Sequence, residues 1–380
     1  MVFTNARVVF PDGVRSGLDV ICAGGRISEI RVAEPVPSGE AIDLAGNYLA
    51  PGFIDLHVHG AVGRDSMEAA PEAFRAICDY HATGGTTSLL LTTTTAPLAE
   101  IVNVLRAVAD CRTQFPQIAG VHVEGPFISR ERAGAQRAEF IVNPEPRAVD
   151  ALLGCSDVIR RITLAPELPG ALEAIDRFRA AGIAVSGGHS DASDEEAARA
   201  FARGMSHTTH TFNCMSSSRR RGGARVAGLL EFALSEPGIA CELIADGHHV
   251  SSTLMKMLYR AKGAAGICLV TDATAGAGLR EGSGFRLGGR DCVVANGACW
   301  LADRSALAGS AARMIDLVRT MVRAVGVPLH EAIGMASANP ARALGWDDKG
   351  TIAVGAAADL AVLSPALEVV ETLVAGRRVA

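Results

Sequence analysis

The sequence predicts an α/β fold: a (β/α)8 TIM barrel with a small β-sandwich domain built from both termini. Between residues 51 and 345, apolar β-type runs alternate with alanine-rich amphipathic segments, which is the pattern of parallel strands joined by helical crossovers. Residues 1–50 and 346–380 contain short strand-like runs separated by turns instead. The length of 380 residues accommodates a barrel of about 250 residues and one small domain.

The two ends of the chain are expected to form one composite β domain, made of residues 1–50 and 346–380. In the first part, turn signals such as Pro-Asp-Gly at 11–13 and Ala-Gly-Asn at 45–47 separate β-branched runs. The second part returns to the same pattern, and neither part contains a periodic segment of helical length.

The catalytic barrel is expected within residues 51–345. The candidate strands are Phe53–Val58, Thr86–Leu91, Ile118–Val123, Ile162–Ala165, Ile183–Ser186, Met205–Thr209, Ile239–Ala245 and Ile267–Thr271. The candidate helices are Pro71–Tyr80, Leu98–Cys111, Ala171–Ala181, Asp194–Arg203, Ser252–Ala261, Ser310–Val325 and Leu329–Ala336, with a hairpin around Gly288–Trp300. A doubly wound open sheet is the alternative, but no glycine-rich nucleotide-binding motif follows any candidate strand.

The bulk composition excludes several classes of partner. A net charge of −5 argues against binding to nucleic acid or to a membrane surface. The nine cysteines are scattered and form no C-x-x-C pair, which indicates reduced thiols. We see no signal-peptide pattern and no apolar run of membrane-spanning length, so we expect a cytoplasmic protein.

The first candidate strand ends in two histidines, His57 and His59. Side chains two residues apart on a strand point to the same face, so both imidazoles aim beyond the strand end. Neutral imidazole is the commonest metal ligand in proteins, and this pair offers half of a metal site. For an isolated His-x-His pair, a structural role with hydrogen bonds to the backbone is the better interpretation. Whether this pair binds a metal therefore depends on which residues follow the other strands.

Five further strand ends carry residues that bind metals or transfer protons. They are His122 and Glu124, His189 and Asp191, His207 and His210, Asp246 with His248 and His249, and Asp272. Catalytic groups of a barrel lie at the carboxyl ends of its strands, so this convergence indicates a metal centre. Only His81 and His330 lie elsewhere, and we expect them to be structural or surface residues.

The chemistry of these residues predicts hydrolysis. Glu124, His189 and His210 form a sufficient ligand set for a catalytic zinc ion, and His57 with His59 can hold a second ion that Glu124 bridges. A divalent ion lowers the pKa of its bound water from about 16 to about 7. Asp272 is the candidate general base and later acid, with a helix cap or a further ligand as its alternative role.

The motifs on these strand ends resemble those of the N-acetylglucosamine-6-phosphate deacetylase family of the amidohydrolase superfamily, over nearly the whole chain. They are PGFIDLHVHG (51–60), HVEGPF (122–127), GHSDAS (188–193), THTFNCM (209–215), ADGHHV (245–250), TDAT (271–274) and LAGS (307–310). The first motif is common to the superfamily, whereas HVEGPF together with the TH…N…M pattern is specific to this branch.

The resemblance implies metal-dependent removal of the acetyl group from N-acetylglucosamine 6-phosphate, by a homodimer. It assigns the main metal to Glu124, His189 and His210 and the catalytic carboxylate to Asp272. Because His57 and His59 are present, it implies the form that can hold two divalent ions, Zn2+ in the first place with Fe2+ as the alternative. The residues that it assigns to the substrate are Gln136, Asn213, Cys214, His249, Leu307 and Ala308.

The chain departs from the family pattern after the sixth strand. The family places an arginine there that reaches the phosphate from the neighbouring subunit, and Arg221 is its best positional match. Arg220 and Arg225 are alternatives, and a solvated loop is the other interpretation of this basic cluster, which also includes Arg219. His248, where an apolar residue is usual, is a second departure.

Three alternative functions remain open; the departures bear on the identity of the sugar and on the phosphate. The first is action on an epimer, N-acetylgalactosamine 6-phosphate, and the second is action on an N-acyl substrate without phosphate, such as an N-acyl amino acid. The third is a non-catalytic scaffold with the same barrel. A scaffold predicts missing ligands, whereas the complete set is present here.

Overall fold

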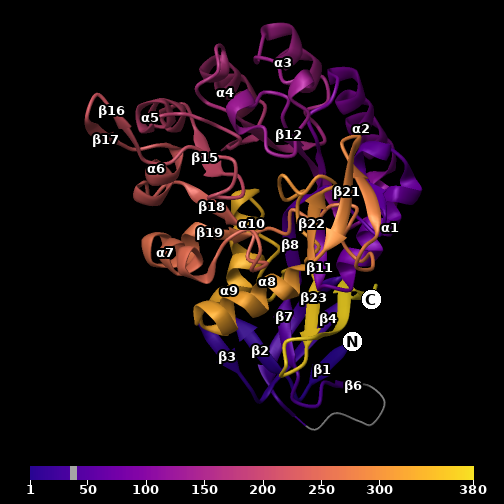
Figure 1. Ribbon diagram of the computed structural model, residues 1–380. Helices are drawn as coiled ribbons and strands as arrows, with labels where there is room; N and C mark the ends of the chain where they lie inside the picture. The colour runs from indigo at the N-terminus through magenta and orange to yellow at the C-terminus, as the bar shows by residue number, and fades with distance from the viewer. Residues whose placement is uncertain (35–40) are drawn as a thin grey trace.

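The computed structural model describes residues 1–34 and 41–380. At its centre lies an eight-stranded parallel sheet in the order β19-β18-β15-β14-β13-β12-β11-β8 (Figure 1). Its strands are β8 (Phe53–Val58), β11 (Thr86–Thr93), β12 (Ile118–Glu124), β13 (Ile159–Leu164), β14 (Ala184–Gly187), β15 (Met205–Thr208), β18 (Ala240–Leu243) and β19 (Ile267–Leu269). A parallel bridge between Val58 and Ala273 joins the first strand to the segment after the last, so the sheet is a nearly closed barrel. The predicted fold class is confirmed.

Helices pack around this barrel. They are α1 (Pro71–Ala82), α2 (Leu98–Cys111), α3 (Pro146–Leu153), α4 (Ala171–Ala180), α5 (Asp194–Ala202), α6 (Leu229–Ser235), α7 (Ser252–Lys262), α8 (Met314–Thr320), α9 (Leu329–Ala336) and α10 (Ala338–Ala343). Local sequence explains several starts: Pro71 and Pro146 occupy the first helical position, where a missing N–H costs nothing. The hydroxyls of Ser193 and Ser251 cap α5 and α7.

The predicted helices agree with the structure except in a few places. Helices α3, α6 and α10 have only eight, seven and six residues, and the sequence pattern did not indicate them. The helix expected from Ser310 begins at Met314 and continues into a π-helical turn at Met321–Val325. Within residues 1–34 and 41–380, every helix is too short or too polar to span a bilayer.

Both ends of the chain build a small β sandwich, as predicted, and they lie side by side in Figure 1. One sheet has the order β25 (Arg377–Arg378), β24 (Val369–Val374), β23 (Leu360–Leu363), β7 (Tyr48–Pro51), β2 (Arg7–Phe10), β3 (Gly13–Arg15). The other has the order β5 (Arg26–Val32), β4 (Leu18–Ala23), β1 (Val2–Thr4), β6 (Ala41–Asp43). Phe3, Ile27, Leu49 and Leu360 are fully buried in the core of the sandwich. The boundaries at residues 50 and 346 stay a prediction.

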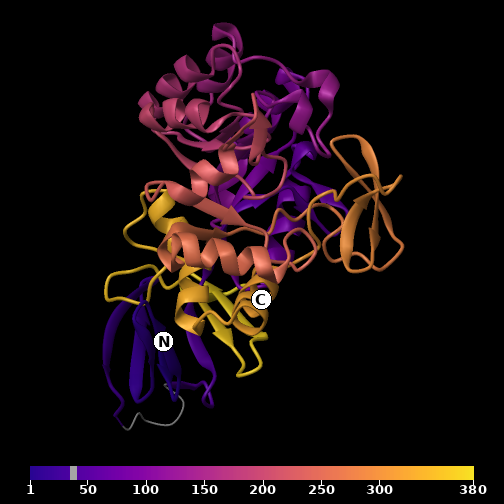
Figure 2. The same cartoon turned by 60° about the vertical axis from the view of Figure 1, so that its left-hand side comes forward.

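Three small sheets are inserted in the loops of the barrel. They consist of β9 (Gly60–Ala61) with β10 (Arg64–Asp65), β16 (Arg219–Arg221) with β17 (Ala224–Val226), and β20 (Gly284–Leu287) with β21 (Arg290–Ala295) and β22 (Ala298–Leu301). The last is the expected hairpin with one more strand, and Figure 2 shows it standing beside the barrel. Its turn uses Asn296 and Gly297, both at positive φ, as an Asn-Gly hairpin requires.

Candidate active site

Strand β8 delivers two imidazoles to the mouth of the barrel. His57 and His59 are both buried, and their Nε2 atoms lie 3.1 Å apart. Both rings lie on the same face of the strand, as the alternation of side chains along a strand predicts.

Strand β12 places Glu124 at the centre of the site. Its Oε1 lies 3.2 Å from Nε2 of His189 and 3.1 Å from Nε2 of His210, and these two nitrogens are 3.0 Å apart. Glu124, His189 and His210 thus form the predicted trio, although they come from three different strand ends.

The same carboxylate also faces the histidines of β8. Nε2 of His57 lies 3.4 Å from Oε1 of Glu124, and Nε2 of His59 lies 3.3 Å from Oε2. His57, His59 and Glu124 form a second trio of potential ligands that shares Glu124 with the first.

The two trios fit divalent cations. Nδ1 of His189 donates a hydrogen bond to the carbonyl of Arg132 at 2.8 Å, so Nε2 is the ring atom that faces Glu124 and would be the one to bind a metal. Burial raises the pKa of Glu124, but the charges of His57 and His189 and the hydrogen bonds from His189 and His210 hold it well below its usual range. Glu124 is therefore an anion, and imidazoles with one carboxylate are a donor set for zinc or iron.

Three residues of the site have a strained backbone. His189, His210 and Asp272 adopt positive φ values of 46°, 30° and 48°. Such conformations cost about 1–3 kcal/mol each in a residue with a side chain, and they persist where surrounding contacts enforce them. One such contact is the bond from the Asp272 N–H to the carbonyl of His57, at 2.9 Å.

Asp272 lies between the metal-type ligands and the open cavity. Its Oδ1 is 3.3 Å from Nε2 of His59 and 3.4 Å from Nε2 of His57. Burial raises the pKa of Asp272, but the two imidazoles outweigh it and the pKa lies below its ordinary value. The next helix, α8, begins only at Met314, so Asp272 caps no helix, and its residue lines the cavity described next.

A cavity of about 220 Å³ opens beside these groups. Its walls include His59, Glu124, His189, His210 and Asp272, whereas His57 is buried behind them. The other lining residues are Gly134, Ala135, Gln136, Asn213, Cys214, His249, Thr274, Leu287, Ala306, Leu307 and Gly309. The Gln136 amide donates to Oε2 of Glu124 at 2.6 Å and accepts from the Thr95 N–H at 2.7 Å, which fixes its orientation. Ala308 is buried behind Leu307, where its carbonyl accepts a hydrogen bond from the Thr274 hydroxyl.

Comparison with known proteins agrees with this geometry. Residues 48–379 match the model of the amidohydrolase family. The N-acetylglucosamine-6-phosphate deacetylase of Lysinibacillus sphaericus is 34% identical over 99% of this chain and 97% of its own length. The N-acetylgalactosamine-6-phosphate deacetylase of Escherichia coli O157:H7 is also 34% identical, over 99% and 98%. The crystal structure of N-acetylglucosamine-6-phosphate deacetylase from Pasteurella multocida superimposes with a TM-score of 0.93, at 34% identity, over 99% of this chain and 98% of the other.

The chain belongs to the amidohydrolase family. Its relatives confirm the resemblance that the motifs indicated, to N-acetylglucosamine-6-phosphate deacetylases in particular. A further solved structure is that of a mutant N-acetyl-D-glucosamine-6-phosphate deacetylase from Mycobacterium smegmatis in complex with N-acetyl-D-glucosamine-6-phosphate. It is 30% identical to this chain, with a TM-score of 0.93, over 100% of this chain and 99% of the other.

The far wall of the amidohydrolase cavity carries a histidine paired with an acid. Nδ1 of His249 lies 2.7 Å from Oδ2 of Asp246. Burial lowers the pKa of His249, but the hydrogen bond and charge of Asp246 outweigh it, so the pKa lies above its ordinary value. His248 is exposed and does not line the cavity, so only one of these two adjacent histidines does.

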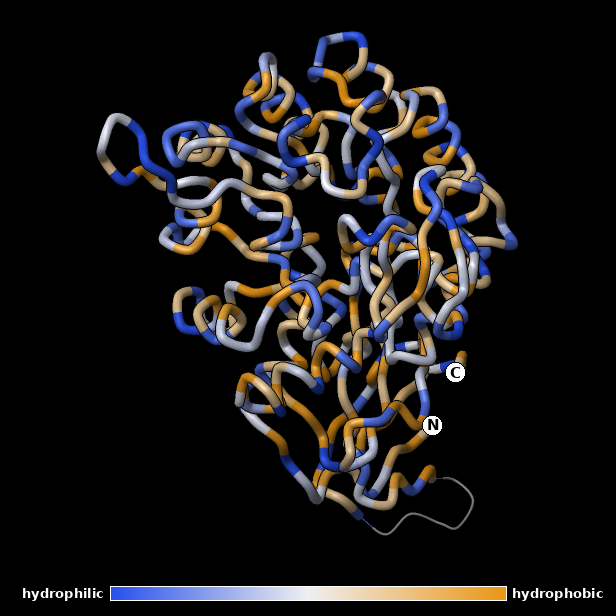
Figure 3. Tube along the Cα trace, viewed as in Figure 1, coloured by the Kyte–Doolittle hydropathy of each residue, from blue (hydrophilic) through white to orange (hydrophobic). Residues whose placement is uncertain are grey.

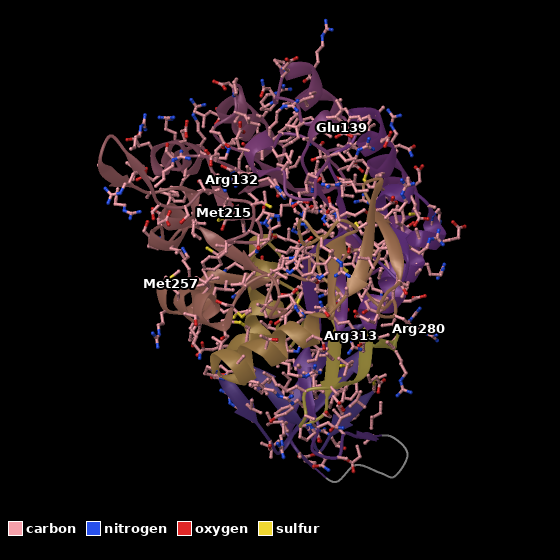
Figure 4. All side chains as sticks on the ribbon, viewed as in Figure 1. Arg132, Glu139, Met215, Met257, Arg280 and Arg313 are labelled. Carbon is pink, nitrogen blue, oxygen red and sulfur yellow. The ribbon has the colours of Figure 1, made fainter. Side chains whose placement is uncertain are left out.

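The basic cluster of this amidohydrolase forms the β16–β17 hairpin, where the sequence suggested a loop. Arg221 is exposed near its tip and lies outside the cavity of its own chain. The hairpin extends from the barrel and is strongly hydrophilic at Arg219–Arg221 (Figure 3). Arg219 forms an ion pair with Asp191, which also pairs with Arg132. Figure 4 shows Arg132 and Met215 on the same side of the molecule as the hairpin.

Sequence reasoning missed the charged pair beneath the site, Arg161 and Glu242. Glu242 is the one charged residue of the predicted strand Ile239–Ala245, and a charge in such an apolar run was the signal that could have revealed it. Arg161 lies next to Arg160, directly before the predicted strand Ile162–Ala165, and carried no such signal. His122 packs edge-on against His57, with ring centroids 4.5 Å apart, as a packing residue would. His207 lies in a separate pocket among residues at the start of β18 and β19.

Proposed function

We propose that this protein is a metal-dependent deacetylase that converts N-acetylglucosamine 6-phosphate and water to glucosamine 6-phosphate and acetate. One observation carries this proposal: Asp272 lines a small cavity and lies within 3.4 Å of His57 and His59. These two histidines belong to the pair of ligand trios that share Glu124. The family membership and the names of the relatives support the same reaction. We propose Zn2+ as the metal, with Fe2+ as the alternative and one or two ions per subunit.

Each residue has a defined task in this reaction. A divalent cation held by Glu124 and the histidines would supply positive charge to the site and would lower the pKa of water. Asp272 removes a proton from the water whose oxygen bonds to the carbonyl carbon. The carbon–nitrogen bond then breaks, and Asp272 returns the proton to the departing amine. Leu307 and Ala306 offer an apolar wall for the acetyl methyl group, and Gln136 offers its amide to a sugar hydroxyl.

A substrate comparison tests this proposal. The purified protein should release acetate from N-acetylglucosamine 6-phosphate far faster than from N-acetylglucosamine or an N-acetyl amino acid. N-acetylgalactosamine 6-phosphate is the second candidate, because a deacetylase of that sugar is as similar to this chain as the glucosamine enzymes are. Equal rates with and without the phosphate would contradict the proposed substrate.

We propose that Arg221 binds the 6-phosphate across a homodimer, since it lies outside the cavity of its own chain. Arg221→Gln should raise KM for the phosphorylated sugar by about ten- to hundredfold, because a charge-assisted hydrogen bond is lost. Arg220→Gln and Arg225→Gln test the two alternative arginines on the same hairpin. An unchanged KM for Arg221→Gln, or a monomer at assay concentration, would contradict this role.

The pH dependence of KM tests His249. Because the pKa of His249 is raised, its cationic form persists to higher pH than in an ordinary histidine. Its attraction for the phosphate is present below that pKa and is lost as pH rises through it. KM for the phosphorylated sugar should therefore rise at alkaline pH. Asp246→Asn removes the cause of the raised pKa and should shift that rise to lower pH. An identical profile in both proteins would remove His249 from phosphate binding.

We also propose a cytoplasmic location. All nine cysteines are free within the described part of the chain, and a reducing compartment suits them.

A further inference from the structure

A fully buried ion pair lies inside the barrel, below the metal-type ligands. Arg161 on β13 and Glu242 on β18 are 1% and 0% exposed, and Nη1 of Arg161 lies 2.5 Å from Oε1 of Glu242. Strands β14 and β15 separate the two in the sheet, so the pair spans the interior of the barrel. No step of the proposed reaction uses either residue.

Glu242 contacts one ligand of each trio through its second oxygen. Oε2 lies 3.4 Å from Nδ1 of His57 and accepts the backbone N–H of His210 at 3.0 Å. A carboxylate at Nδ1 holds the ring proton there and leaves the lone pair on Nε2, which faces Glu124 and Asp272. The second bond helps to hold His210 at its strained φ of 30°.

Arg161 is the buried cation that faces Glu242 within the barrel. Arg161 also donates to the hydroxyl of Ser186 at 2.8 Å, and Ser186 is hydrogen-bonded to Thr209, the neighbour of His210. Both members of the pair are thus tied to the segments that carry metal-type ligands.

Stability alone explains this pair poorly. The cost of removing two charges from water commonly cancels their attraction, and apolar replacements of a buried pair are often neutral or stabilising. An outer carboxylate that orients a ligating histidine, in contrast, typically changes metal affinity or activity by about 10- to 100-fold.

We infer that Glu242, paired with Arg161, is a positioning residue that sets the proton of His57 and the backbone of His210 so that both ligand trios bind divalent metal. This inference rests on the proposed metal-dependent function and deepens it. It assigns a role to two residues that lie outside the cavity and touch no substrate.

Two double variants separate the effect of the Glu242 acceptor oxygen from the effect of the buried charges. Arg161→Met with Glu242→Met removes the pair and the acceptor, whereas Arg161→Met with Glu242→Gln removes the charges and keeps an acceptor oxygen of the same reach. We expect Zn2+ affinity, measured by chelator competition, to fall about 10- to 100-fold in the first and to recover substantially in the second. Metal content and melting temperature are measured on the same samples.

A third variant covers the case in which the methionine pair does not fold. Glu242→Asp keeps the buried charge beside Arg161 and withdraws the oxygens from His57 and His210 by one methylene. It should also weaken Zn2+ binding. Wild-type affinity in a folded Glu242→Asp protein, or equal wild-type affinity in both double variants, would overturn the inference.

The outcome is separable from the proposed function. If wild type binds Zn2+ but releases no acetate from amino-sugar phosphates, the substrate proposal fails while the affinity comparison remains valid. If wild type is an active deacetylase and the variants bind Zn2+ as tightly as wild type, only the positioning role fails.

Discussion

Replacing Asp272 by asparagine is expected to lower kcat by a factor of about 100 to 10,000 while leaving metal content unchanged. Asparagine has nearly the same shape, but its amide cannot take a proton from water or return one to the amine. Asp272 contacts His57 and His59 at 3.3–3.4 Å, and the two trios around Glu124 remain complete without it. Acetate release and elemental analysis of the same preparation measure both quantities.

Asp303→Asn is the control for this variant, because that carboxyl is exposed and lies outside the cavity. It should have wild-type turnover. Near-normal turnover in Asp272→Asn would remove Asp272 from proton transfer, and loss of metal in that variant would make it a ligand instead.

Replacing His189 by alanine should remove the main metal and with it nearly all activity. Nε2 of His189 lies within 3.2 Å of both Glu124 and His210, so the trio loses one of its three donors. We expect Zn2+ affinity to fall by at least about 100-fold, more than for an outer-sphere residue. Elemental analysis after dialysis against a weak chelator measures the loss.

His330→Ala is the matched control, since this histidine lies on α9 and lines a different cavity, away from Glu124. It should retain metal and activity. Full metal content in His189→Ala would mean that the ion is held by other residues and that the ligand trio is wrong.

The geometry of the site was predictable because it depends on simple periodicities. His57 and His59 share a face since strand side chains alternate, and parallel strands bring their carboxyl ends to one mouth. Glu124, His189 and His210 therefore meet although up to 86 residues separate them along the chain. The alternation of side chains and the parallel strand order are sufficient to bring these residues together.

Other features could not be predicted, for equally physical reasons. Helix α6 has seven residues, too few for a helical period to emerge from the apolar pattern. The β16–β17 hairpin consists mainly of exposed arginines and glycines, and only Val226 is half-buried, so the sequence shows no alternating apolar face that would indicate a strand. The contact of Glu242 with His57 depends on the packing of side chains within the barrel, which strand order alone does not specify.

Acetate release from N-acetylglucosamine 6-phosphate, followed through removal and restoration of metal, tests the metal-dependent deacetylation most directly. We predict that the purified protein releases acetate, loses this activity with a strong chelator, and regains it when Zn2+ or Fe2+ is added back. A protein stripped of metal that still releases acetate at the full rate, or a metal-loaded protein that releases none, would contradict it.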